Sequence, residues 1–155
     1  MTLIPQLWIL LDVLIAVILG GILGYERESK EKPAGFRTNM LIAGTSALLL
    51  SLGRIVVNEM EVNVSDTALG VDPTRIIHAI IVGVSFIGAG TILESRDEDT
   101  IKYLTTAATI LLSCAVGMAV ALNQYVIAVG ITLLGLIVNA AVRKIGHLVG
   151  EEKRP

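Results

Sequence analysis

The feature that most constrains this chain is one uninterrupted apolar stretch. Residues 104–142 carry no charged side chain over 39 positions. As a single helix the stretch would be about 58 Å long, nearly twice the roughly 30 Å hydrocarbon core of a bilayer. It must therefore fold back on itself, and Asn123 with Gln124 forms the polar break near its middle. We expect two membrane-spanning helices, over about 104–121 and 125–142.

Three further segments are long and apolar enough to cross a bilayer. They cover about 4–24, 38–54 and 74–94, which brings the total to five spans. Hydrophobic residues make up 54% of the 155 residues and charged residues 17%, against about 25% charged in an average soluble domain. A soluble globule of this length buries only about 70% of its surface, too little to hide so much apolar area. The sequence predicts an all-α, polytopic transmembrane bundle that forms a single domain over 1–155.

Charge and cysteine content exclude several functions. The net charge is -2, so no basic surface indicates a nucleic-acid partner. Cys114 is the single cysteine, which leaves no disulfide framework and no cysteine-based metal site. We find no pairing of a nucleophile with a base, and we expect neither enzymatic activity nor a cofactor. Mg²⁺ bound by the acidic loops is the alternative to simple solvation of those carboxylates.

The distribution of Lys and Arg predicts the orientation in the membrane. Ten of them lie in the 25–37 loop, the 95–103 loop and the tail after 142, and two lie at the edges of the 53–75 loop. Because cytoplasmic loops carry the excess of positive residues, the N-terminus is predicted to lie outside and the C-terminus in the cytoplasm. The first span is expected to be retained, since it lacks the features of a cleaved signal peptide.

In this topology polar residues from several helix ends meet at the cytoplasmic leaflet. Each charge there is either an interfacial anchor or a member of a paired cluster. We expect Glu26 and Arg37 to pair across the loop between the first two spans. Arg37 at a helix N-terminus also suggests an anion site, and backbone capping alone is the other interpretation of its two neighbours. The predicted cytoplasmic cluster contains Glu26, Arg27, Arg37, Thr38, Asn39, Glu94, Thr105 and Asn139.

Small residues recur at helical spacing in the first and third spans. Such residues let two helix backbones approach closely in lipid, and they serve packing within one chain and between chains equally well. The expected helix-packing residues are Gly20, Gly24, Ala79, Gly83, Gly88 and Gly90.

Ionisable residues inside the spans are the remaining candidates. Asp12 lies within the first span, and an intramembrane acid indicates a functional site by default. The alternative is a structural pairing with Arg75 or His78 near the outer leaflet. A stripe of hydroxyls on the fourth span either lines a polar path or hydrogen-bonds to backbone carbonyls. That stripe consists of Thr105, Thr109 and Ser113, with Gly117 continuing the spacing.

At these motifs the sequence resembles the MgtC/SapB family of bacterial inner-membrane proteins. The resemblance covers about residues 5–142 and is closest to the short, SapB-like branch, so no C-terminal soluble domain is expected. It implies about five spans, a role in magnesium homeostasis and growth at low Mg²⁺, and binding to the membrane part of F-type ATP synthase. The matching motifs are G20xxxG24xERE28, A34GFRTN39, R75I76, G83xxFxGAG90 and L104TTAA108.

Two functions follow as hypotheses. The first is a regulator of magnesium homeostasis that binds another membrane protein. The second is a small ion transporter or channel, which would be a homo-oligomer because five short helices can hardly enclose a path alone. The middle of each span is mostly apolar, and this favours binding over transport.

Overall fold

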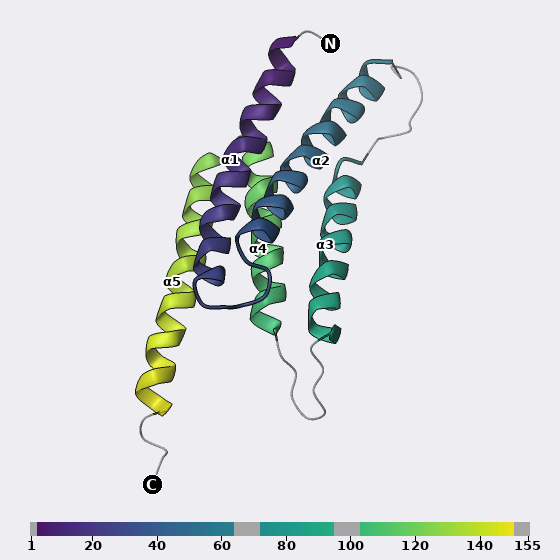
Figure 1. The fold of residues 1–155 in the computed structure, drawn as a ribbon. Coiled ribbons are helices and arrows are strands. Elements are labelled where there is room, and N and C mark those ends of the chain that lie inside the picture. The colour runs from purple at the N-terminus through teal and green to yellow at the C-terminus, as the bar shows by residue number, and fades with distance from the viewer. Residues whose placement is uncertain (1–2, 64–71, 95–102, 151–155) are drawn as a thin grey trace.

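The computed structural model describes residues 3–63, 72–94 and 103–150, with side chains over 3–60, 72–93 and 103–140. Every regular element in these ranges is an α-helix, which confirms the predicted all-α bundle (Figure 1). The five helices are α1 (Leu3–Glu28), α2 (Phe36–Asn63), α3 (Thr74–Glu94), α4 (Leu104–Ala121) and α5 (Tyr125–Gly150).

The helices begin close to the starts of the predicted spans, and three of them extend beyond the predicted ends. α3 and α4 coincide with the expected 74–94 and 104–121. α1, α2 and α5 continue past their apolar segments into polar sequence, to Glu28, Asn63 and Gly150. Hydropathy marks where a chain enters lipid, whereas a helix ends only where its backbone hydrogen bonds end, so the two boundaries need not coincide.

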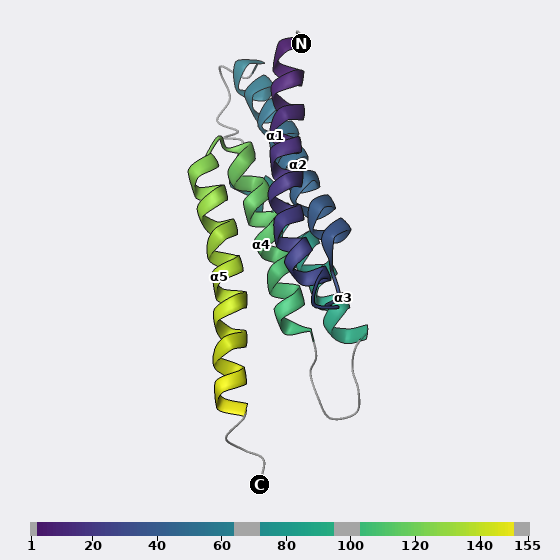
Figure 2. The same ribbon diagram turned by 60° about the vertical axis from the view of Figure 1, so that its left-hand side comes forward.

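The fourth helix is the centre of the bundle. Between the described residues, α4 contacts all four other helices, while α3 contacts α2 and α4 alone, and α5 contacts α1 and α4 alone. Figures 1 and 2 show α1 and α2 side by side across α4, with α3 and α5 on opposite flanks. Most of the buried side chains of the core therefore lie between α4 and the α1–α2 pair.

Glycines allow α1 and α4 to lie directly against the backbone of α2. A Cβ atom added to Gly20 would lie 2.5 Å from the Asn39 carbonyl oxygen. One added to Gly24 would lie 2.7 Å from the Gly35 carbonyl oxygen. At Gly117 of α4 the added atom would overlap the carbonyl of Ala43. These contacts require glycine, because no real Cβ atom approaches backbone this closely.

The small residues of α3 are placed differently. Ile80, Val84 and Gly88 form the stripe that faces inward, and Gly88 lies against Ala107 of α4. Gly88 therefore packs as expected, whereas Ile80 and Val84 face inward in place of Ala79 and Gly83, and a Cβ atom at Gly83 or Gly90 would meet nothing within 4 Å. Ala79 is exposed as well. Within the described part of the chain, these three residues do not pack helices together.

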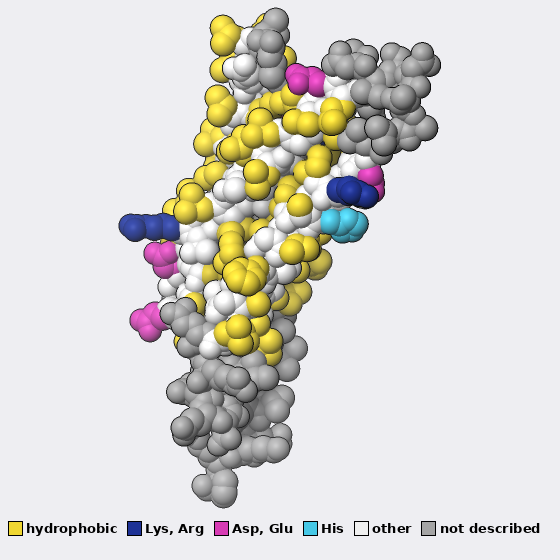
Figure 3. Space-filling view, turned by 90° about the vertical axis from the view of Figure 1, so that its right-hand side faces the viewer, with side chains coloured by type: hydrophobic (Ala, Val, Ile, Leu, Met, Phe, Trp, Pro, Cys, Tyr) yellow, Lys and Arg dark blue, Asp and Glu magenta, His cyan; other side chains and the backbone are white. Residues whose placement is uncertain are grey.

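The outer surface of the bundle is apolar. Figure 3 shows hydrophobic side chains over the face that α2 and α3 present. α1, α2, α3 and α4 are each long and apolar enough to cross a membrane, and the described apolar part of α5, Tyr125–Ala140, is shorter. Large exposed side chains such as Trp8 and Phe86 have no aqueous role, and lipid is the environment that fits them.

Candidate functional site

A set of buried polar side chains joins the helices at the end of the bundle where α1 ends and α2 begins. Arg27 of α1 is 6% exposed, and its Nη2 donates to Oγ1 of Thr106 at 2.5 Å. Thr106 lies in the first turn of α4 and is fully buried. An arginine at this depth is stable only with hydrogen-bond acceptors, and α4 supplies one.

Asn39 of α2 is the most fully bonded member of this set. Its Nδ2 donates to the carbonyl oxygens of Ala34 at 2.5 Å and Gly35 at 2.9 Å. Its Oδ1 accepts from the hydroxyl of Ser113 on α4 at 2.7 Å. Asn39 therefore ties the loop before α2 to α4 rather than capping the N–H groups of α2.

The cap of α2 comes from a residue that the sequence did not single out. The carboxylate of Glu28, the last residue of α1, accepts from the backbone N–H of Phe36 at 2.7 Å. A carboxylate at a helix N-terminus also interacts favourably with the helix dipole. This contact closes the short connection between α1 and α2.

Glu26 forms different contacts from those expected. Its Oε2 accepts from Nδ2 of Asn139 on α5 at 3.2 Å, and its Oε1 forms an ion pair with Lys30 one turn later. Arg37 is exposed, and no ion pair between Arg37 and Glu26 is present in the described residues. Glu26 pairs with Lys30 rather than with Arg37 because residues four apart at helical spacing lie on the same face.

These side chains border a cavity that we call the basic pocket. It has a volume of about 270 Å³. Its polar lining comes from α1, the loop that follows, the first turn of α4 and the middle of α5. The residues that line it are Glu26, Arg27, Lys30, Lys32, Thr105, Val138 and Asn139.

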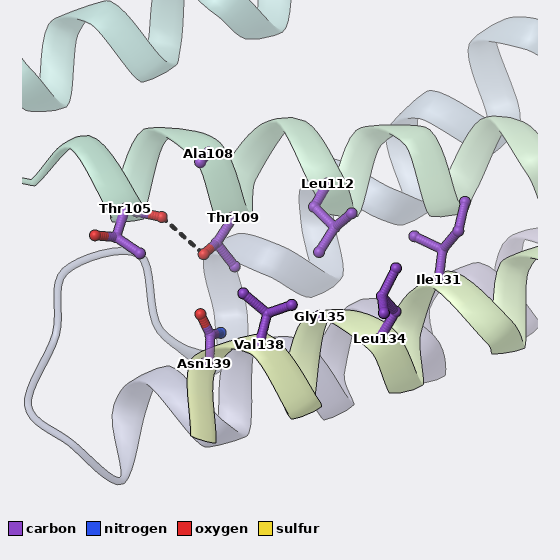
Figure 4. Close-up of a pocket in the computed structure, with 9 residues that line it drawn as sticks. All are labelled: Thr105, Ala108, Thr109, Leu112, Ile131, Leu134, Gly135, Val138 and Asn139. Carbon is purple, nitrogen blue, oxygen red and sulfur yellow. Dashed lines mark hydrogen bonds between the residues drawn. The ribbon is translucent and has the colours of Figure 1, made fainter. Parts of the chain in front are cut away.

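A second cavity, the α4–α5 groove, continues from the basic pocket. It has a volume of about 300 Å³ and shares Thr105, Val138 and Asn139 with that pocket. Figure 4 shows the remaining lining side chains running along both helices, ending at Leu112 and Ile131. Thr109 in the groove donates its hydroxyl to the carbonyl of Thr105 at 2.8 Å. The hydroxyl of Thr109 thus bonds to a backbone carbonyl, which was the expected alternative to lining a polar path.

A separate polar site lies at the opposite end of the bundle. Asp12 is 8% exposed, and its Oδ1 accepts from the hydroxyl of Tyr125 on α5 at 2.7 Å. Arg54 donates to the carbonyl of Ala121 at 2.6 Å beside it. Both Asp12 and Arg54 line a cavity of about 350 Å³. Arg75 and His78, the partners considered for Asp12, are exposed on α3.

The structure thus brings together half of the predicted cytoplasmic cluster. Glu26, Arg27, Thr105 and Asn139 share the basic pocket, and Asn39 lies in the same buried layer. Thr38 is half-buried beside it, and the side chain of Glu94 lies outside the described residues.

The main partners that sequence reasoning missed are Thr106, Lys30, Lys32 and Tyr125. Thr106 carried a usable signal. It begins a buried stripe on α4 that continues through Ile110, Ser113 and Gly117, and this stripe starts one residue after the predicted one and shares its last two positions. No feature of the sequence predicted the contact of Tyr125 with Asp12, because an aromatic residue at a span end is equally typical of the interfacial belt.

The described residues contain no group of three or more His, Cys, Asp or Glu that could hold a metal ion. Among the described residues, the two buried or half-buried acids are Asp12 and Glu26, which lie about 21 Å apart along α1. Each is already hydrogen-bonded to a side chain of α5. Mg²⁺ is held by oxygen ligands and keeps several waters.

Apolar outer faces and polar side chains bonded to one another inside define a multi-pass α-helical membrane protein, whose environment is a lipid bilayer. Among such proteins the chain belongs to the MgtC family. It matches the model of that family over residues 13–148.

Three relatives illustrate the membership. The chain is 34% identical to a Haemophilus influenzae protein over 92% of its length and 60% of the relative's. It is 34% identical to Escherichia coli "Putative magnesium transporter YhiD" over 83% of its length and 58% of the relative's. It is 32% identical to MgtC of Salmonella typhimurium, over 92% and 55%. The chain thus spans somewhat over half the length of these relatives. No solved structure gives a significant match.

Proposed function

We propose that this chain is a bacterial inner-membrane protein of magnesium homeostasis that acts by binding and regulating another membrane protein. Membership of the MgtC family and the printed name of the Escherichia coli relative support the link to magnesium. No catalytic step is part of the proposal. The proposal that the protein binds a partner rather than transports an ion rests on how the polar groups are distributed inside the bundle.

The observation that carries the proposal is an apolar layer between the two polar ends. On α1, α2 and α4 the buried polar layer reaches no further than the Ser46–Cys114 hydrogen bond of 3.2 Å, and the buried Thr132 of α5 donates its hydroxyl to the Ala128 carbonyl of its own helix. Between that bond and Asp12, the buried side chains of the three central helices are apolar. They are Ala16 and Leu19 of α1, Ala47 and Leu50 of α2, and Val116 and Val120 of α4. An ion path needs polar lining through the bilayer, and this layer interrupts it.

The outward face of α3 supports a protein partner within the membrane. Only 17% of the most apolar 18-residue stretch of α3 is buried inside the bundle, against 50% for the same length of α4. A Cβ atom at Gly83 or Gly90 would meet nothing within 4 Å, and Gly83 lines an open groove of about 370 Å³ between α2 and α3. Small residues gain nothing against lipid, whereas they let a second helix approach closely. The family resemblance nominates the membrane part of F-type ATP synthase as the partner, and a second copy of this chain is the alternative occupant.

The test uses Gly83→Leu and Gly90→Leu, with Val82→Leu as the control on the same helix. Val82 is 68% exposed, and a Cβ atom at Gly83 or Gly90 would meet nothing within 4 Å. All three variants should therefore fold with an unchanged Tm in detergent. We expect the two glycine variants to lose crosslinking to the partner and to fail in restoring low-Mg²⁺ growth to a bacterium without its own MgtC-family protein. Val82→Leu should retain both. Equal behaviour of the three variants in both assays would contradict the proposal.

Transport of Mg²⁺ is the second candidate function. The name of the Escherichia coli relative and the buried acid Asp12 favour it. Purified protein in liposomes should show no Mg²⁺ flux above empty liposomes if binding is the function. A flux that Asp12→Asn abolishes would establish transport instead.

A further inference from the structure

We propose that the basic pocket and the α4–α5 groove together bind one anionic phospholipid. The phosphate diester of the headgroup would lie in the pocket and one acyl chain in the groove. The inference is independent of the proposed function, because it concerns a different face of the bundle from the outward side of α3.

The first support is an unsatisfied donor on Arg27. This side chain lines the pocket and is 6% exposed, and one of its nitrogens donates to Thr106. Its Nε is fully buried and has no hydrogen-bond partner among the described residues. A buried, unpaired donor on a cation is costly, and phosphate oxygens are the acceptors that a guanidinium group matches best.

The second support is charge. Three cations line the pocket, Arg27, Lys30 and Lys32, and Glu26 is its single carboxylate. Glu26 is engaged by Lys30, so the lining keeps an excess of positive charge. The N-terminus of α4 adds to it. Tyr103 at that end provides no side-chain cap, and the free N–H groups of the first turn carry partial positive charge.

The third support is the apolar continuation of the pocket. The groove leaves the basic pocket at Thr105 and Asn139 and follows α4 to Leu112, a distance of about 10 Å (Figure 4). The side chains that line this part of the groove are mostly apolar, and Ala108 among them is small enough to leave space for a ligand. A free phosphate ion would use only the pocket. A molecule with a charged head and an apolar tail uses both cavities.

The predicted orientation agrees with this ligand. The pocket lies at the end of the bundle predicted to face the cytoplasm, at the depth of lipid headgroups. Anionic lipids attract basic groups at such positions by about 1 kcal/mol for each Lys or Arg, or about fivefold in affinity.

The direct test is native mass spectrometry of the full chain in a non-ionic detergent. Phosphatidylglycerol should remain bound at least tenfold more often than phosphatidylcholine of the same chain length. Inorganic phosphate and glycerol phosphate, added in separate arms, should not displace it at equal concentration. Equal retention of the two lipids would overturn the proposal, and displacement by inorganic phosphate would assign the pocket to a free anion instead.

Two pairs of variants assign the binding to these cavities. Lys32→Gln should weaken phosphatidylglycerol binding about fivefold, whereas Arg37→Gln, an exposed cation at the same end outside the pocket, should not. Ala108→Trp should fill the groove and abolish retention, whereas Ala89→Trp on the exposed side of α3 should not. All four substitutions are at positions outside the buried core, so each variant should fold. Equal binding within either pair would overturn the proposal.

Discussion

At the scale of single residues, several buried polar side chains find a partner on another helix, while the hydroxyls of Thr109 and Thr132 donate to a carbonyl of their own helix. Arg27 and Asn39 both reach α4, through Thr106 and Ser113. A side chain–side chain hydrogen bond between membrane helices is worth about 0.6 kcal/mol on average, so none of these contacts dominates stability. Their larger effect is on register, because shifting α4 by one residue would leave both α1 and α2 with unpaired polar groups.

Asn39 should be more important for stability than its partner. Asn39→Leu removes three side-chain hydrogen bonds and takes from the Ala34 carbonyl its side-chain donor, at a cost of about 2 kcal/mol or more, whereas the Gly35 carbonyl still accepts from the backbone N–H of residue 39. Ser113→Ala removes one bond, at about 0.6 kcal/mol. The free energies of unfolding in mixed micelles measure both. Equal losses would show that the Ala34 carbonyl finds another donor.

Gly117 and Gly130 form a matched pair for testing close packing. Gly117→Ala places a Cβ atom into the carbonyl of Ala43 and should cost about 1–3 kcal/mol as the helices separate. Gly130→Ala meets nothing within 4 Å and should be neutral or slightly stabilising, because alanine favours helix. The Tm of each variant in detergent is the measurement. A similar Tm for both would contradict the tight α2–α4 contact.

At the scale of helices, sequence predicted position along the chain far better than rotation about the axis. The apolar runs placed α3 and α4 correctly at both ends, because charged residues, or the polar pair Asn123 and Gln124 at the end of α4, bound those runs. On α3, Gly88 packs as expected, but Ile80 and Val84 face inward rather than Ala79 and Gly83. Apolar residues surround this helix, and hydropathy does not distinguish a neighbouring helix from lipid.

The same limit applies to the candidate site. Glu26, Arg27, Thr105 and Asn139 were expected together because their spans end at one depth, and the structure places all four around one pocket. The choice of partner was not predictable. Glu26 contacts Lys30 and Asn139 rather than Arg37, since pairing depends on which way each helix end faces.

The start of α3 should depend on pH. Asp72 accepts from the hydroxyl of Thr74 at 2.6 Å and from its backbone N–H at 2.9 Å, and these bonds lower the pKa of the carboxyl below its ordinary 3.8. A lowered pKa means that the stabilisation is present at neutral pH and is lost as the pH falls through that lowered value. Amide hydrogen exchange at Arg75–Ile77 should accelerate in Asp72→Ala at neutral pH. Unchanged exchange would show that the cap is dispensable.

At the scale of the whole molecule, the distribution of Lys and Arg makes a prediction about orientation. Reporter fusions after Lys30, Asp99 and Lys153 should read cytoplasmic, and fusions after Asn63 and Asn123 should read external. The reason is the excess of ten basic residues over two on the predicted inner side. An external signal at Lys30 would reverse the orientation and would place the basic pocket in the outer leaflet.

The central position of α4 has a consequence for the order of assembly. A ribosome adding about 5–20 residues each second completes α2 several seconds before α4. During that interval Arg27 and Asn39 have entered the membrane without Thr106 and Ser113. The nascent chain therefore needs protection by the insertion machinery until its fourth helix arrives. A chain truncated after Glu94 should be degraded in pulse-chase experiments much faster than the chain that continues through Ala121.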